Sequence, residues 1–236
     1  MNTDVFEVTA ASELDSPETK PPEFHTNVDG GLDDNAIEAF ETDGVVCLRK
    51  ILNEDQVLAL GQGANQSFKT PGPLGYKVEQ TDGKGTFYYD FNMHERLDVF
   101  RWLVFDSRVP DIGASLMRSP GVTLYYSNLF IKQAGSPAPS PWHEDASYQR
   151  MNGLGVINFW IALDWIPAET ALMFKRGSHL RDEPVFQAYH FDGDKGYDQP
   201  VITRERGQMP PFEQLDRRFE TIWWELYPGD ALVFTQ

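Results

Sequence analysis

The chain has 236 residues, of which 41% are hydrophobic and 13% aromatic, enough to bury the core of one large domain. It carries 36 acidic residues against 20 lysines and arginines, a formal net charge of −16. Nucleic acids and anionic membranes bind basic surfaces, so this charge excludes both as expected partners. No apolar run is long enough to cross a bilayer, and the N-terminus does not read as a signal peptide. The sequence therefore predicts a cytoplasmic protein.

The N-terminal part begins with an acidic segment, residues 1–33, that is rich in Pro, Thr, Ser and Gly and is predicted to form a loose arm. The following stretch, "DDNAIEAFETDG", predicts a short helix. Asp34 or Asn35 is expected to cap it, and Gly44 to end it. Its apolar side is formed by Ile37 and Phe40.

A helical and mixed layer is predicted to follow. Residues 45–51 predict a buried strand that contains the lone cysteine, Cys47, as an inert core thiol. Asn53 is a predicted cap for a second helix. The residues of that helix expected to face the core are Val57, Leu58 and Leu60. Residues 96–119 read as mostly helical, with an interruption near Pro110.

The second half of the chain has the character of a β-protein. Residues 121–135, 155–167, 220–227 and 231–236 are rich in β-branched and aromatic residues and are separated by turn signals. No helical run between them is long enough for a crossover, which favours an antiparallel sandwich or jelly roll over a parallel sheet. Residues 180–220 form a long insertion with many Gly, Pro and polar residues, which predicts a substrate-selecting lid.

The stretch "SPAPSPWHEDASYQ" places a histidine, His143, two residues before Asp145. In an extended segment both side chains point to one side, with Glu144 facing away. One imidazole and one carboxylate suit a divalent metal such as iron, zinc or manganese. They also suit a catalytic His–Asp pair, but the chain has no GxSxG serine or reactive cysteine to complete it. The alternative for so short a motif is a surface histidine beside solvated acids.

Several motifs together resemble one enzyme family. They are "LYYSNLFIKQAGS", "WHEDASY", "FWIALDWIPAE", "GSH" and "WELYPGDALVF", in that order. This set resembles the phytanoyl-CoA dioxygenase family of non-haem iron, 2-oxoglutarate-dependent oxygenases, from about residue 34 to the end. The resemblance implies a single domain over 34–236, mainly β with flanking helices, built as a double-stranded β-helix (a cupin-like jelly roll). It also implies that His143 and Asp145 are the first two ligands of Fe(II).

The same resemblance implies a second set of residues, around the co-substrate 2-oxoglutarate. Lys132 matches a family lysine that contacts 2-oxoglutarate, and Asn128 and Trp160 match positions near it. The alternatives are a solvent-facing lysine at a strand end and a tryptophan that only packs in the core. Asp145 also bears on the reaction, because halogenating relatives lack this carboxylate. Hydroxylation with release of succinate and CO₂ is therefore expected.

The family pattern has two further residues, a second histidine ligand and an arginine for 2-oxoglutarate. They follow the strand that "PGDALVF" begins, so they are expected to lie beyond Gln236. His179 matches a structural turn of the family, and His190 lies in the insertion.

Three functions remain open at this point: an oxygenase that hydroxylates a small organic molecule with O₂, a binding or regulatory jelly roll that retains part of the metal site, and a cupin-type metalloenzyme. The acidic balance of the chain favours a substrate that is neutral or carries one carboxylate.

Overall fold

The computed structural model describes residues 20–27, 31–79, 85–134, 142–147, 155–182 and 217–236. The strands are β1 Glu23–His25, β2 Val45–Arg49, β3 Tyr76–Glu79, β4 Thr86–Phe91, β5 Asn128–Lys132, β6 Ile157–Ile161, β7 Met173–Lys175, β8 Thr221–Trp223 and β9 Ala231–Thr235. The α-helices are α1 Asp34–Asp43, α2 Glu54–Lys69, α3 Asp98–Phe105 and α4 Val109–Leu116. Four 3₁₀ turns are η2 Met93–Glu95, η3 Asp145–Ser147, η4 Ala168–Thr170 and η5 Ser178–Leu180.

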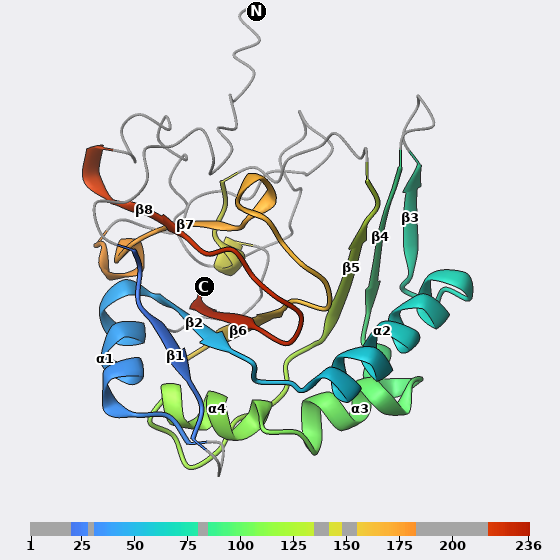
Figure 1. Cartoon of the computed structure of the whole chain (residues 1–236), viewed down its shortest axis with the longest axis horizontal. Coiled ribbons are helices and arrows are strands. Elements are labelled where there is room, and N and C mark those ends of the chain that lie inside the picture. Colours follow the sequence, from blue (N-terminus) through green and yellow to red (C-terminus); the bar gives the residue numbers. More distant parts are fainter. Residues whose placement is uncertain (1–19, 28–30, 80–84, 135–141, 148–154, 183–216) are drawn as a thin grey trace, which may run out of the picture.

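The described strands form three sheets, in the orders β1-β2-β9-β6, β3-β4-β5 and β7-β8. The three-stranded sheet stands at one side of the molecule, and the helices lie along the lower side in Figure 1. The mainly β architecture with flanking helices that the sequence predicts is confirmed. Among the described residues, no helix combines the length and apolar character needed to cross a membrane.

The first two helices form where local sequence predicts them, with two corrections. Asp33, not Asp34 or Asn35, caps α1, because its backbone is extended and its carboxylate accepts from the Ala36 amide at 2.9 Å. Gly44 ends α1 with φ 79°, as predicted. In α2, Asn53 forms the predicted cap and Leu60 is buried, but Leu58 is 62% exposed. Leu58 and Leu60 are two residues apart on a helix, so they cannot both face the core.

The helical stretch predicted at 96–119 divides into α3 and α4. The break falls at residues 106–108 and not at Pro110. Pro110 lies in the first turn of α4, where its missing N–H has no intrahelical partner to lose.

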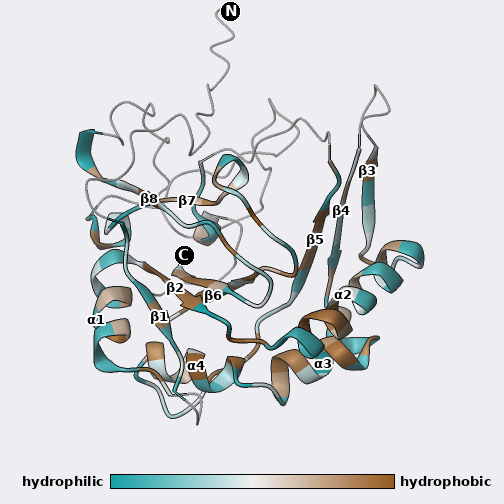
Figure 2. Ribbon diagram, viewed as in Figure 1, coloured by the Kyte–Doolittle hydropathy of each residue, from teal (hydrophilic) through white to brown (hydrophobic). Residues whose placement is uncertain are grey.

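The four-stranded sheet separates two hydrophobic clusters. One face packs on the helices, through residues such as Val46, Leu48 and Val233. The other face carries Val45, Cys47 and Leu232, which pack with Ile222 and Trp224 from the β8 side. Figure 2 shows hydrophobic residues on the helices and on the strands of the four-stranded sheet.

Cys47 is the buried thiol that the sequence predicts, and burial raises its pKa to about 12. The thiol is therefore neutral at ordinary pH, in keeping with an inert core residue.

The strand predicted at 121–135 is shorter than expected, because β5 begins only at Asn128. Its partner β4 ends at Phe91, which pairs with Asn128. The next residue, Asn92, turns away in a left-handed conformation with φ 55°, so residues before Asn128 have no strand to pair with.

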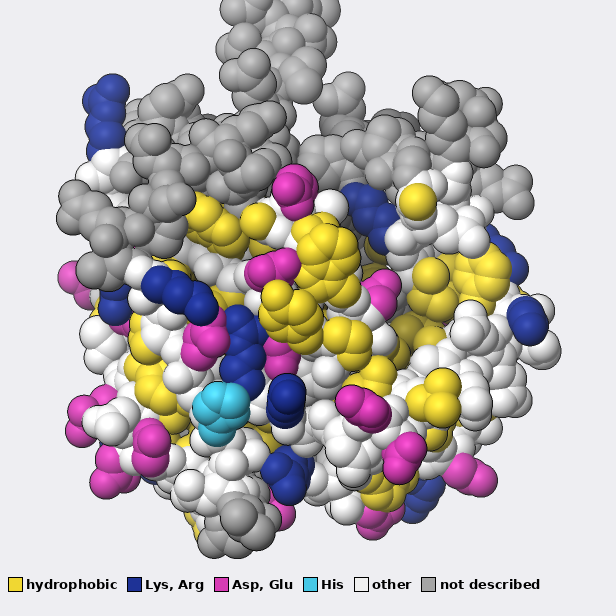
Figure 3. Space-filling model, viewed as in Figure 1, with side chains coloured by type: hydrophobic (Ala, Val, Ile, Leu, Met, Phe, Trp, Pro, Cys, Tyr) yellow, Lys and Arg dark blue, Asp and Glu magenta, His cyan; other side chains and the backbone are white. Residues whose placement is uncertain are grey.

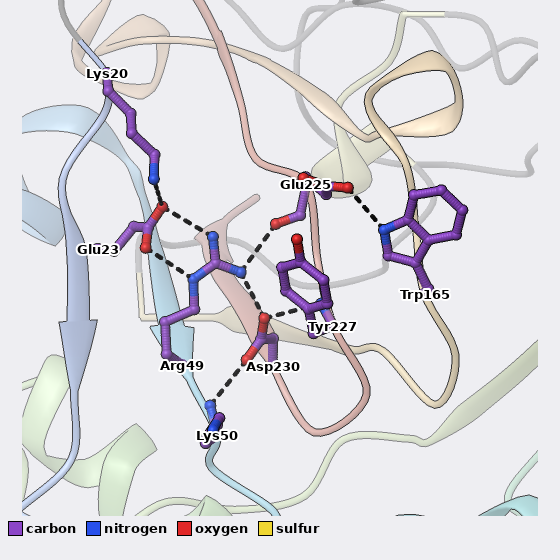
Figure 4. Close-up of polar contacts among 8 residues, drawn as sticks. All are labelled: Lys20, Glu23, Arg49, Lys50, Trp165, Glu225, Tyr227 and Asp230. Atoms are coloured by element: carbon purple, nitrogen blue, oxygen red, sulfur yellow. Dashed lines mark hydrogen bonds and ion pairs between the residues drawn. The ribbon is translucent and has the colours of Figure 1, made fainter.

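Part of the predicted N-terminal arm is ordered as β1, which runs parallel to β2. Figure 4 shows how Arg49 holds it: the guanidinium pairs with Glu23 at 2.9 Å and with Asp230 at 2.5 Å. Asp230 also accepts from the backbone amides of Lys50 and Tyr227, both at 2.9 Å. The ion pair with Arg49 lowers the pKa of Glu23 to about 2. These contacts fasten the arm to the turn between β8 and β9. Residues 1–19 of the arm lie outside the described residues.

Candidate functional site

The two residues of the HxD motif lie in a short segment, residues 142–147, which we call the HxD turn. The His143 Nε2 and Asp145 Oδ1 atoms are 3.3 Å apart, and their side chains are 25% and 29% exposed. Asp145 begins η3, so the segment bends where an extended strand was expected. The two side chains nevertheless converge, as the i, i+2 spacing predicts.

This separation suits a shared metal ion. A divalent first-row metal holds imidazole nitrogen and carboxylate oxygen at about 2.1 Å, so two such donors at right angles lie about 3.0 Å apart. The observed 3.3 Å is close to that value. The donor set therefore fits two neighbouring positions on one ion. Within the described part of the chain, no group of three or more His, Cys, Asp and Glu side chains forms a complete metal site.

Asn158 of β6 orients the Asp145 carboxylate. Its Nδ2 donates to Asp145 Oδ2 at 3.0 Å, which leaves Oδ1 as the oxygen beside His143. Asn158 and Trp160 alternate onto the same face of β6, and their partners across β9 are Phe234 and Leu232. That face belongs to the second hydrophobic cluster. The HxD turn thus lies against the side of the four-stranded sheet that faces away from the helices.

Trp142 and Glu144, which alternate with His143 and Asp145 along the HxD turn, contact other segments. Glu144 forms an ion pair with Arg181, and the two side chains are only 14% and 9% exposed. The Lys175 ammonium of β7 lies 5.3 Å from the centre of the Trp142 ring and donates to Thr221 Oγ1 at 2.5 Å. Glu144 therefore has a charged partner of its own, apart from the His143–Asp145 pair.

The turn that carries Arg181 is itself fixed to α1. The Gly177 amide donates to the Asp43 carbonyl at 2.9 Å. His179 Nε2 lies 3.1 Å from the Glu41 carbonyl oxygen, and burial lowers the pKa of this imidazole. The ring packs on Gly44, where an added Cβ would lie 2.5 Å from His179 Nδ1. His179 therefore has the structural role that the resemblance implies. His190 and residues 183–216 of the insertion lie outside the described residues.

The residues expected around 2-oxoglutarate lie on two strands. Lys132 ends β5 with an exposed side chain, as in the strand-end alternative, and partial desolvation lowers the pKa of its ammonium group. Asn128 begins β5, and its Oδ1 is buried without a hydrogen-bond partner. Trp160 packs against the second hydrophobic cluster. The core-packing alternative describes Trp160 as the structure shows it, while Asn128 has an unused polar atom.

Sequence reasoning missed the residues that support the motif: Asn158, Lys175 and Arg181. Each contacts the HxD turn from a distant part of the sequence, and even Asn158 is 13 positions after Asp145. Only the placement of Arg181 just after "GSH" marked its neighbourhood, and nothing local linked it to Glu144.

Comparisons with known proteins identify the family and the fold of the chain. The family model described as phytanoyl-CoA dioxygenase (PhyH) matches residues 40–236. No curated protein matches the chain. Among solved structures, the non-haem α-ketoglutarate-dependent carbocyclase SnoK from nogalamycin biosynthesis has 19% identity and a TM-score of 0.67, covering 89% of this chain and 77% of SnoK.

Two further structures are similar. The epimerase SnoN in complex with Fe³⁺, α-ketoglutarate and nogalamycin RO has 20% identity and a TM-score of 0.63, over 86% of this chain and 73% of SnoN. EctD from S. alaskensis with 2-oxoglutarate and 5-hydroxyectoine has 18% identity and a TM-score of 0.61, over 94% and 77%. These likenesses establish the fold, which is the predicted jelly roll.

Proposed function

The chain belongs to the phytanoyl-CoA dioxygenase family, whose cofactors are Fe(II) and 2-oxoglutarate, and we propose that it hydroxylates a small organic molecule with release of succinate and CO₂. The observation that carries the proposal is the convergence of His143 and Asp145 to 3.3 Å, on a turn held by its neighbours. His143 and Asp145 would hold the iron, which when bound supplies the activation of O₂. The carboxylate of Asp145 supports hydroxylation, since halogenating relatives lack it.

The chain's own residues have two tasks in this proposal. Asn158 keeps one oxygen of Asp145 occupied, so the other oxygen stays aimed at the position shared with His143. Lys132 binds a carboxylate of 2-oxoglutarate, with Asn128 and Trp160 nearby. Partial desolvation lowers the pKa of Lys132, and a dicarboxylate beside it would stabilise the charged form. Solved relatives named as a carbocyclase and an epimerase make the product of this enzyme the point to test.

The first test is anaerobic binding. Adding Fe(II) and 2-oxoglutarate to the protein should give the weak visible charge-transfer band of a bidentate complex. His143→Ala and Asp145→Ala should lose the band and abolish succinate formation while leaving the fold intact. His25→Ala, which removes an exposed histidine on β1, is the matched control and should keep both. Succinate formation at the normal rate by Asp145→Ala would refute the site, and wild-type protein without the band would support a binding role instead.

The second test concerns the product. Incubation under ¹⁸O₂ with a substrate that stimulates succinate release should yield a product 18 mass units heavier than the substrate, from one inserted oxygen-18 atom. A product that has lost two hydrogens, or one of unchanged mass, would replace hydroxylation with cyclisation or epimerisation.

A further inference from the structure

The three-stranded sheet has one face on which five of eight residues are aromatic. Its register places three cross-strand rows on this face: Tyr76 with Tyr89 and Phe130, Val78 with Phe87 and Lys132, and Phe91 with Asn128. We call these eight residues the aromatic face. The alternate residues Tyr88 and Leu129 point the other way and are buried with residues of α2. The side of the sheet that carries Tyr88 and Leu129 therefore packs in the core, and the aromatic face lies on the other side.

The rings of the aromatic face touch one another in a continuous series. Tyr76 and Tyr89 have ring centres 5.6 Å apart, and Tyr89 and Phe91 5.8 Å. Phe87 and Phe130 are 6.1 Å apart with only 9° between their planes. Even so, Tyr76 is 58% exposed and Phe130 52%. Figure 3 shows hydrophobic side chains at the surface over this sheet. Contiguous exposed apolar surface of this kind marks a binding site.

The polar residues of the aromatic face narrow the chemistry of its ligand. None of the eight residues is acidic, although the chain has 36 acids against 20 lysines and arginines. The one charged member is Lys132, at the end of β5, the residue that the proposed function assigns to 2-oxoglutarate. A surface without acids suits a ligand that is neutral or singly negative.

We propose that the aromatic face binds a planar aromatic molecule that carries at most one negative charge. Flat rings stack on aromatic side chains, and the tyrosine hydroxyls supply polar contacts at the edges. That this molecule is the substrate rests on the proposed oxygenase function; that it binds does not. A second copy of the chain is the less suitable occupant, because a formal charge of −16 on each copy opposes association.

The test measures binding alone, by equilibrium dialysis of the metal-free protein without 2-oxoglutarate. The probe is 6-hydroxy-2-naphthoate, compared with its saturated decahydro analogue and with the cation 6-(aminomethyl)-2-naphthol. Loss of ring stacking costs about 1–3 kcal/mol, so the probe should bind roughly tenfold or more tightly than the saturated analogue. The cation should also bind more weakly than the probe, because the ammonium group of Lys132 repels its positive charge.

Two substitutions locate the site. Phe130→Ala and Phe130→Leu should each weaken probe binding by about tenfold, the second because it keeps apolar area but removes the ring. Phe105→Ala is the matched control: it removes a ring that is 48% exposed on α3 and is not one of the eight residues of the aromatic face. This variant should bind the probe as the wild type does.

Several results would overturn the proposal. They are equal binding of the aromatic and saturated compounds, no binding of either at millimolar concentration, and equal losses in the Phe130 and Phe105 variants. Sedimentation that shows a wild-type dimer and a Phe130→Ala monomer, without preference for the aromatic probe, would assign the face to self-association. Probe binding without the iron and 2-oxoglutarate band would keep this inference and refute the oxygenase function. The charge-transfer band without a preference for the aromatic probe would keep the oxygenase function and refute this inference.

Discussion

The HxD turn and the aromatic face are held in place by opposite means. Three side chains of the turn have a partner from another segment: Trp142 has Lys175, Glu144 has Arg181, and Asp145 has Asn158. The aromatic face is ordered by the register of its own three strands, and its rings contact one another. Substitutions around the turn should therefore disturb both stability and metal geometry. Substitutions on the face should change ligand binding and leave the fold almost unaffected.

The largest effect is expected where the turn meets β6. Asn158→Ala removes the hydrogen bond that orients Asp145, so the carboxylate can rotate away from His143. Loss of such a partner to a metal ligand lowers metal affinity about 10–100-fold. Titration of Fe(II) under nitrogen, followed by the charge-transfer band, measures this. Asp164→Ala, at an exposed acid after β6, is the control and should bind iron normally. Unchanged iron affinity in Asn158→Ala would mean that the turn orients Asp145 without β6.

The next effect concerns the anchor beneath the turn. Gly44→Ala places a Cβ 2.5 Å from His179 Nδ1 at a position with φ +79°, so both the ring and the backbone must adjust. The free energy of unfolding should fall by about 1–3 kcal/mol. Gly61→Ala in α2 is the matched control, since nothing lies within 4 Å of its added Cβ. Alanine there should be neutral or stabilising. Urea unfolding compares the free energies of unfolding of the two variants. Equal values would show that His179 and the backbone at Gly44 can adjust to the added Cβ without a loss of stability.

The buried ion pair of the turn should matter more than a surface pair of the same type. Glu144→Gln removes the charge that faces Arg181, where both side chains are mostly buried, and should cost about 1–2 kcal/mol. Glu41→Gln breaks the pair of Glu41 with Arg118, where the side chains are 49% and 54% exposed, and should lower the stability less than Glu144→Gln does. Thermal unfolding at low and high salt measures both. If Glu144→Gln loses no more stability than Glu41→Gln, the turn does not depend on this contact.

The contrast also explains what could be predicted from the sequence. The i, i+2 spacing predicted the convergence of His143 and Asp145. The side-chain type of Asn53 and the acids that follow it predicted the cap of α2. The alternation of Asn128, Phe130 and Lys132 on β5 is also a local property, because side chains two residues apart on a strand share a face. Asn158 and Arg181 were not, because their contacts join segments that have no common pattern. The late start of β5 depends on where its partner β4 ends, which is again a property of the fold.

The smallest effect on stability is expected on the aromatic face. Phe130 is 52% exposed, so Phe130→Ala loses cross-strand contacts worth at most about 1 kcal/mol and leaves no cavity. Leu60→Ala is the buried counterpart: Leu60 is fully buried in the helix-side cluster, and its truncation should cost about 2–5 kcal/mol. Urea unfolding of both variants measures the difference, and Fe(II) titration should find normal affinity in Phe130→Ala. A loss for Phe130→Ala that equals the loss for Leu60→Ala would show that the face is part of the core. The exposed rings would then contribute mainly to the stability of the fold. The distinction between a turn that positions metal ligands and a sheet face that binds a ligand would no longer hold.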